Sequence, residues 1–134
     1  MVKPKSKISK KSISAKDRSD FFVERVYFWR DVFAFNDVEL SVFSQVSDDA
    51  RATWDYDVSG GLVSIAYSVD WINDSNVLLD EVDLVAFHEV FEAQMFKLCN
   101  LLVGFYSDSY IQSLLHEITR KAENSIYLKL KDLN

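Results

Sequence analysis

The chain has 134 residues, of which 49% are hydrophobic and 14% aromatic. This length allows one domain with a modest core and is too short for two. The formal net charge is −6, and such an acidic body argues against a domain that binds duplex nucleic acid. No apolar run is long enough to cross a bilayer.

The sequence also predicts a cellular compartment. The chain's single cysteine, Cys99, excludes an internal disulfide and fits a reducing environment. The N-terminus contains no apolar stretch typical of a signal peptide. We therefore expect a cytoplasmic protein that does not bind membranes.

Residues 1–16 form a basic arm that we predict to be disordered. The segment is rich in lysine and serine and has few large apolar side chains, so it cannot bury enough surface to fold. Residues 1–18 carry seven basic side chains against one acid, whereas the remainder carries eight bases against twenty acids. The arm could make weak electrostatic contacts with nucleic acid, or it could serve only to keep the protein soluble.

Residues 17–134 are predicted to form a single α+β domain that opens with a helix over about residues 17–35. Ser14 or Asp17 could cap the start of this helix, and Asn36 and Asp37 favour a turn at its end. Bulky apolar side chains recur at helical spacing: Phe21, Phe22, Val26, Phe28, Trp29, Val32 and Phe33.

Three strands are predicted next, over residues 38–44, 50–58 and 62–69. Each alternates apolar and polar side chains, which is typical of a half-buried strand. Gly60 and Gly61 lie between the last two strands and favour a hairpin turn. We expect a small, mainly antiparallel sheet. Only one face of the strand at 62–69 is strongly apolar, so its other face is left for a different contact.

Two helices complete the predicted domain. Acidic residues at 80–83 lie in the first turn of one helix, where the helix dipole favours negative charge, and Gly104 ends that helix. Residues 107–109 cap the second helix, which runs to about Tyr127. Because the turn near Gly104 is short, we expect these two helices to form an antiparallel hairpin.

A histidine and two glutamates lie within the first helix of this hairpin. Its apolar stripe is formed by Leu84, Phe87, Phe91, Met95, Leu98 and Leu102. Helical spacing places His88 and Glu92 one turn apart on the flank of that stripe. A carboxylate there must be paired, protonated or bound to a cation, because an unpaired buried charge costs several kcal/mol.

The only other histidine, His116, lies on the last predicted helix. With a turn near Gly104 and a rise of ~1.5 Å per residue, His116 falls within about one helical turn of the level of Glu92. His88, Glu92 and His116 can therefore converge on one point. Two imidazoles and a carboxylate form a common catalytic zinc set, in which zinc lowers the pKa of bound water towards neutrality.

Glu89 directly follows the first of these candidate ligands. In the helical H-E-x-x-H motif the glutamate at this position is the general base, and we predict the same role for Glu89. The chain has an HExxE variant of the motif, since Glu92 stands where the second histidine is usual. Arg51, Arg120 and Glu123 are candidates for residues that support the metal ligands from outside.

A family resemblance rests on several short segments: residues 49–52, Trp71, residues 86–92, His116, Glu117, Ile118, Arg120, Glu123 and Asn124. Through them the chain, from Phe21 onward, resembles small phage- and prophage-encoded proteins described as zinc metallopeptidases of a minimal zincin type. The resemblance implies an active-site helix beneath a small sheet, with substrate held as an extra antiparallel strand on a sheet edge. It makes residues 62–69 the expected substrate edge and the cytoplasm of a bacterial host the expected location.

Two functions remain open from the sequence. The first is a zinc-dependent hydrolase that acts on a peptide or protein substrate. The second is a non-catalytic protein-binding module on the same scaffold, in which His88 and Glu92 form a structural hydrogen-bonded pair, with Arg120 as a third member. Glu117 and Glu123 could equally solvate their helix or pair with neighbouring bases.

Two further assignments limit these alternatives. The three tryptophans, Trp29, Trp54 and Trp71, are assigned to the core. A di-iron carboxylate site is excluded, because it needs a Glu-x-x-His motif on each of two helices of a four-helix bundle. The chain has neither that motif nor enough predicted helices.

Overall fold

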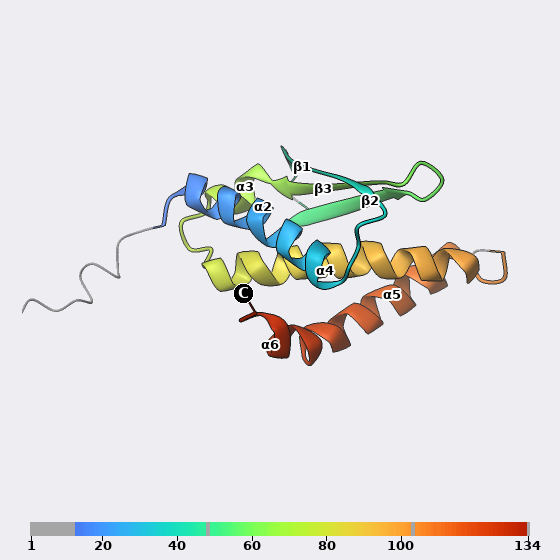
Figure 1. Cartoon of the computed structure of the whole chain (residues 1–134). Coiled ribbons are helices and arrows are strands. Elements are labelled where there is room, and N and C mark those ends of the chain that lie inside the picture. Colours follow the sequence, from blue (N-terminus) through green and yellow to red (C-terminus); the bar gives the residue numbers. More distant parts are fainter. Residues whose placement is uncertain (1–12, 48, 103, 134) are drawn as a thin grey trace, which may run out of the picture.

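The computed structural model describes residues 13–47, 49–102 and 104–133 (Figure 1). Its elements are α2 (Ala15–Val32), β1 (Glu39–Gln45), β2 (Ala52–Asp57), β3 (Leu62–Ser68), α3 (Val69–Asn73), α4 (Leu79–Cys99), the 3-10 turn η1 (Asn100–Leu102), α5 (Asp108–Glu123) and α6 (Ile126–Leu130). The predicted α+β class and the single three-stranded sheet are confirmed. The disorder predicted for the arm falls largely on residues 1–12, which lie outside the described residues.

Helix α2 begins two residues before its predicted start, because Ser14 caps it. The Ser14 hydroxyl accepts a hydrogen bond from the Asp17 backbone N–H (3.0 Å), and the Asp17 carboxylate accepts one from the Ser14 backbone N–H (3.4 Å). This capping box satisfies two backbone donors that a helix start leaves unpaired.

The other end of α2 falls three residues before the predicted one. The backbone N–H groups of Ala34 and Phe35 donate to the carbonyls of Asp31 and Arg30, which closes the helix as a Schellman motif. Ala34 takes a left-handed φ of 52° at the position where glycine is usual. Because no glycine occupies this position, the end of α2 could not be located exactly from the sequence.

The sheet has the strand order β1-β3-β2. β2 and β3 form the expected antiparallel hairpin, with Asp57 opposite Leu62. β1 runs parallel to β3, so the prediction of a mainly antiparallel sheet is wrong for this pair. The chain leaves β1, crosses the end of β3 and returns as β2. Two bonds of Ser68 fix the crossing, from its N–H to the Arg51 carbonyl and from its hydroxyl to the Ser47 carbonyl.

β3 is therefore the central strand, and the prediction that residues 62–69 form a substrate edge is wrong. Both of its edges are used in pairing, by β1 and by β2. Val63 and Ile65 point into the core, whereas Leu62 and Ser64 of the less apolar face are more exposed. Ser64 contacts Ser41 of β1 through their hydroxyls at 3.4 Å. The two strands free at an edge are β1 and β2.

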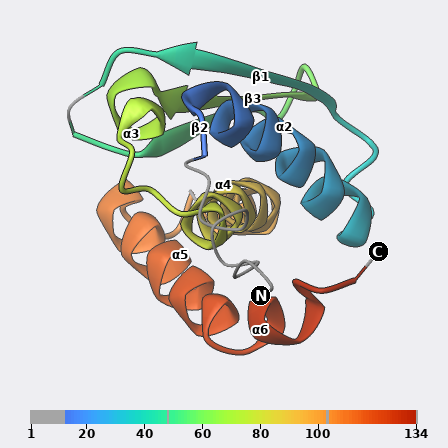
Figure 2. The same cartoon turned by 90° about the vertical axis from the view of Figure 1, so that its left-hand side faces the viewer.

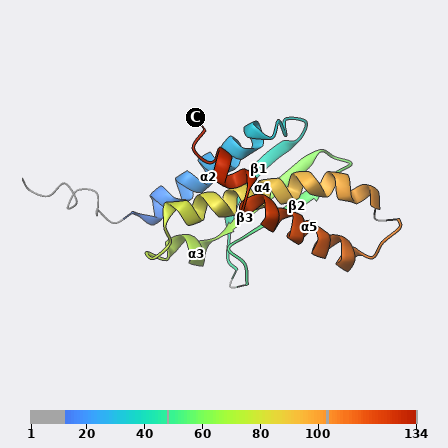
Figure 3. The same ribbon diagram turned by 90° about the horizontal axis from the view of Figure 1, so that it is seen from below.

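The helices cover one face of the sheet (Figure 2). α4 runs through the middle of the molecule, in contact with α2, α5 and β2. Seen from below, α5 runs back along α4 from the turn towards α6 (Figure 3). The fully buried centre includes Phe22, Val26, Trp29, Val63, Ile65 and Phe87. None of the helices within the described ranges has the length and apolar content needed to cross a membrane.

Because α4 is surrounded in this way, it is buried on most sides and not along one stripe. Glu89 and Glu92 are 6% and 4% exposed, as little as their apolar neighbours Val85 and Phe91. Leu98, predicted to belong to the apolar stripe, is 60% exposed. Glu89 and Glu92 are thus buried more deeply than their positions on a helical wheel indicated.

The last predicted helix is divided into α5 and α6. The Asn124 side-chain amide donates to the Arg120 carbonyl (3.0 Å), and the Ser125 hydroxyl donates to the Lys121 carbonyl (2.7 Å). Side chains of this kind compete with backbone N–H groups for the carbonyls of a helical turn. They explain why α5 stops at Glu123.

Asp83 joins three helices from within the core. Its carboxylate, 7% exposed, accepts hydrogen bonds from Arg25 (2.7 Å) and Trp29 (2.8 Å) of α2 and from the Tyr127 hydroxyl (3.0 Å) of α6. Burial and the Asp83 charge raise the pKa of Tyr127. Asp83 is therefore a fully paired buried charge, which fixes α4 against both neighbours.

Candidate metal centre

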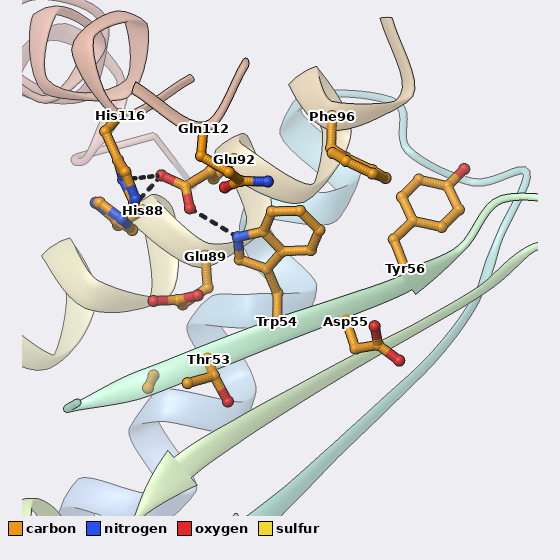
Figure 4. A pocket seen from close by; sticks show the side chains of 11 residues that line it. Thr53, Trp54, Asp55, Tyr56, His88, Glu89, Glu92, Phe96, Gln112 and His116 are labelled. Carbon is orange, nitrogen blue, oxygen red and sulfur yellow. Dashed lines mark hydrogen bonds and ion pairs between the residues drawn. The ribbon is translucent and has the colours of Figure 1, made fainter. Parts of the chain in front are cut away.

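The three predicted metal ligands meet where α4 faces α5 (Figure 4). One ligand atom from each of His88, Glu92 and His116 lies within 4.8 Å of the other two. Glu92 Oε2 is 3.2 Å from His88 Nε2 and 2.9 Å from His116 Nδ1. The imidazole rings of the two histidines are 6.2 Å apart between centroids. The fold thus brings together two residues one helical turn apart and a third from the next helix.

The two oxygens of Glu92 have different surroundings. Oε1 accepts a hydrogen bond from the indole N–H of Trp54 (2.8 Å). Oε2 is buried between the two imidazoles, yet among the described residues no hydrogen bond of proper geometry reaches it. The ring nitrogens are close enough for an ion pair, but they do not direct an N–H bond at this oxygen. A buried oxygen in this state requires a partner, and a cation bound by all three residues would supply one.

His88 is oriented by a carboxylate on its far side. Its Nδ1 lies 3.0 Å from Glu123 Oε2. An ionised Glu123 carboxylate can accept a hydrogen bond but cannot donate one. When Nδ1 donates this bond, the neutral ring keeps the lone pair of Nε2, the atom that faces Glu92. Metal-binding histidines commonly donate their second nitrogen to a carboxylate in this manner. Glu123, predicted as a supporting residue, is in position for that role.

Without a metal, the cluster holds its charges by pairing. Burial lowers the pKa of His88, but the hydrogen bond with Glu123 and the close carboxylate of Glu92 outweigh burial and raise that pKa to about 10. Burial also opposes the ionised form of Glu92, while His88, Trp54 and His116 reverse the effect and lower its pKa. In the metal-free state His88 is therefore a cation shared by two carboxylates.

Glu89 lies beneath His88, on the side of α4 that faces β2 (Figure 4). Burial raises its pKa to about 7, against the opposing positive charges of His88 and Arg51. No hydrogen bond from the described part of the chain holds its carboxylate. Glu89 is thus a buried carboxyl group next to the candidate ligands.

A cleft of about 490 Å³ opens beside the cluster. One wall is β2, which contributes residues 52–56, and the other is made by α4 and α5. His88, Glu89, Glu92 and His116 all reach its surface. The strand beside the candidate centre is therefore β2, which lies at an edge of the sheet, and not the predicted β3.

The two predicted supporting arginines lie further out. The Arg51 guanidinium is 3.6 Å from Glu81 Oε2, and Arg51 shares a small hollow with His88 and Glu89. Arg120 is exposed and borders a second hollow beside His88 and His116. Within the described ranges neither guanidinium bonds to a candidate ligand.

Glu117 pairs with Lys121 at 3.3 Å, whereas Glu123 does not solvate its helix but contacts His88.

The sequence did not indicate two residues of the site, Trp54 and Gln112. Gln112 lines the cleft one helical turn before His116, and this i, i+4 spacing is a signal that could have found it. Trp54 was assigned to the core; it packs against Phe96 with ring centroids 5.0 Å apart and also bonds to Glu92. Alternation along β2 gives the face of Trp54 but does not tell which helix meets that face.

The fold and the site define a small α+β protein in which two helices and an edge strand hold a cluster of two histidines and one carboxylate beside an open cleft. No known family model, curated protein or solved structure matches the chain. A function for this chain must therefore be argued from the residues of the site itself.

Proposed function

We propose that this protein is a zinc-dependent metallopeptidase of minimal zincin type that hydrolyses peptide bonds with a metal-activated water. One observation carries the proposal. Glu92 Oε2 is buried between two imidazole nitrogens, at 2.9 and 3.2 Å, and accepts no hydrogen bond from the described residues. The three groups supply the lone pairs that a cation needs, and they already lie close together.

The ligand types favour zinc among the common metals. Imidazole nitrogen with a carboxylate oxygen is a frequent zinc set, whereas calcium and magnesium prefer oxygen ligands alone. Zinc bound by three protein groups keeps a position for water, lowers the pKa of that water and polarises a carbonyl group. The cleft bordered by these same residues gives substrate access to that position.

Glu89 is the proposed general base. It lies beside the ligands on the cleft surface, and no hydrogen bond from another described residue occupies its carboxylate. We propose that Glu89 takes the proton from the attacking water and passes it to the leaving amine as the C–N bond breaks. A peptide would lie extended along the free edge of β2, since an edge strand can pair with an added strand.

One observation favours the alternative, a non-catalytic protein-binding module. The His88 imidazolium pairs with both Glu92 and Glu123 without any metal. In that case the cluster fixes α4 against α5, and a partner protein binds elsewhere on the acidic body or the basic arm. The two functions differ in whether the purified protein carries zinc.

Elemental analysis of the purified chain tests the metal site. We expect stoichiometric zinc in the wild type, loss of zinc in His88→Ala, Glu92→Ala and His116→Ala, and retention in Glu89→Gln. Circular dichroism should show that all variants are folded. A folded wild type that carries no zinc and takes none up on dialysis would exclude the metal site and leave the binding module.

Cleavage of a peptide library by the zinc-loaded protein tests the chemistry separately. We expect cleavage by the wild type and none by Glu89→Gln, although both carry zinc. Uncleaved peptides with the zinc-loaded wild type, or undiminished cleavage by Glu89→Gln, would contradict the role given to Glu89. The metal site would stand in either case.

A further inference from the structure

Trp54 contacts the candidate centre from the opposite side to the histidines. Its indole N–H donates to Glu92 Oε1 at 2.8 Å, while both imidazoles approach Oε2. Figure 4 shows that the indole reaches Glu92 from β2, whereas His116 reaches Glu92 from α5. Three elements therefore meet at one carboxylate, and each oxygen has its own set of neighbours.

We propose that Trp54 is a positioning residue that holds Glu92 so that only Oε2 is offered to the metal. The inference rests on the proposed zinc site and adds to it the way in which the carboxylate binds. In this proposal Glu92 binds the metal through one oxygen, and the coordination position that its second oxygen would take stays free.

The chemistry of the indole supports this role. An indole N–H is a donor only, so it occupies Oε1 without competing as a ligand for a cation. A hydrogen bond to an ionised acceptor is shorter and stronger than one between neutral groups. Packing against Phe96, with centroids 5.0 Å apart, limits the movement of the ring. Oε1 is therefore held away from the histidines.

The consequence is that a zinc ion held by these three residues would keep a position for water or a carbonyl oxygen. A carboxylate with both oxygens free can bind a cation through both, which fills a site that water or a carbonyl oxygen would otherwise use. Catalytic zinc sites with three protein ligands keep such a position. Trp54 belongs to β2, the strand that forms the cleft wall. A peptide bound along β2 would therefore contact the residue that orients the metal ligand Glu92.

Trp54→Phe is the informative variant, because it removes the N–H and keeps an aromatic ring against Phe96. Trp71→Phe is a matched control. Trp71 donates its indole N–H to Glu81 Oε2 at 2.7 Å, so this change deletes the same type of bond away from the cluster. A loss common to both variants reflects general stability, whereas a loss confined to Trp54→Phe reflects the metal ligand.

The first measurement is the zinc dissociation constant, by competition with a chromogenic chelator. We expect Trp54→Phe to weaken zinc binding about tenfold or more, the range found when a residue that orients a ligand is removed, and Trp71→Phe to leave it unchanged. The second is the visible absorption of the Co²⁺-substituted proteins. Its bands should change in position and intensity in Trp54→Phe only, as the carboxylate gains its second contact.

The wild-type protein offers a test that does not depend on the folding of a variant. The indole N–H resonance of Trp54, assigned through its contacts with the Phe96 ring, should move when zinc is added, whereas that of Trp71 should not. Wild-type zinc affinity and an unchanged Co²⁺ spectrum in Trp54→Phe would overturn the positioning role alone, as would a Trp54 resonance that does not respond to zinc. A wild type that binds no zinc overturns this inference and the zinc site together.

Discussion

Glu92 is a buried carboxylate approached by three nitrogen atoms from three elements of the fold. Trp54 comes from β2, His88 from α4 itself and His116 from α5. Removing a charge from water costs several kcal/mol unless the group is well paired, so the chain keeps this charge only where partners surround it. The arrangement is also specific, since the indole N–H of Trp54 donates to Oε1 whereas the two imidazoles lie against Oε2.

Glu123 is expected to control zinc affinity without touching the metal. Its carboxylate lies 3.0 Å from His88 Nδ1 and increases the basicity of Nε2, the candidate ligand atom. We expect Glu123→Gln, which keeps the shape and removes the charge, to weaken zinc binding about tenfold. Chelator competition at neutral pH measures the effect.

Glu117→Gln is the control for this prediction. Glu117 lies on the same helix, but it is solvent-exposed and pairs with Lys121, and an exposed ion pair contributes little. We expect its zinc affinity to equal that of the wild type. Equal losses in both variants would mean that His88 is not oriented by Glu123 and that only the overall charge of α5 matters.

The sequence could predict the candidate ligands because their positions follow from helix geometry. His88 and Glu92 share a face at i, i+4 spacing, and a short turn near Gly104 places His116 at their level. The deep burial of Glu89 and the contact of Trp54 could not be predicted. Both depend on which strand packs over α4, and neither spacing nor composition carries that information.

At the scale of elements, three helices are fixed to one another at Asp83. We expect Asp83→Asn to lower the free energy of unfolding by about 3–5 kcal/mol, the cost of removing one partner of a buried ion pair. The Arg25 guanidinium, which pairs with Asp83 at 2.7 Å, would be left partly buried without its counter-charge. Urea denaturation followed by circular dichroism measures the loss.

Asp80→Asn is the matched control, since Asp80 lies one turn earlier on α4 and is exposed. It should lose only the helix-dipole contribution, about 0.3–1 kcal/mol. Similar losses in the two variants would show that the network around Asp83 adds little to stability. Zinc binding should be unchanged in both, because neither residue contacts the candidate ligands.

The elements themselves were easier to predict than their arrangement. Alternation located the three strands to within two residues at each end, and the Gly60–Gly61 turn predicted the β2–β3 hairpin. The parallel pairing of β1 was missed because alternation specifies which face of a strand is apolar and not which strand lies next to it. This error affected the functional prediction. The predicted free edge beside the cleft was β3, whereas the structure shows that it is β2.

For the whole molecule, the candidate centre exists only when β2, α4 and α5 are packed together. The unfolded chain holds His88 and Glu92 near each other but leaves His116 far away on average. Zinc should therefore bind the folded state much better than the unfolded state, and binding should stabilise the fold. We therefore expect metal content and folding to be coupled through the packing of α5 against α4.

This coupling predicts a thermal shift. At a free zinc concentration about 100 times the dissociation constant, the free energy of unfolding should rise by about 2.7 kcal/mol. For a chain of this size that corresponds to a Tm increase of roughly 5–10 °C, measured by scanning calorimetry with zinc and with a chelator. His116→Ala is the control, because the imidazole is 52% exposed and its loss costs the metal-free fold little. That variant should keep the metal-free Tm and lose the zinc shift, whereas an equal shift in both proteins would show that zinc binds elsewhere.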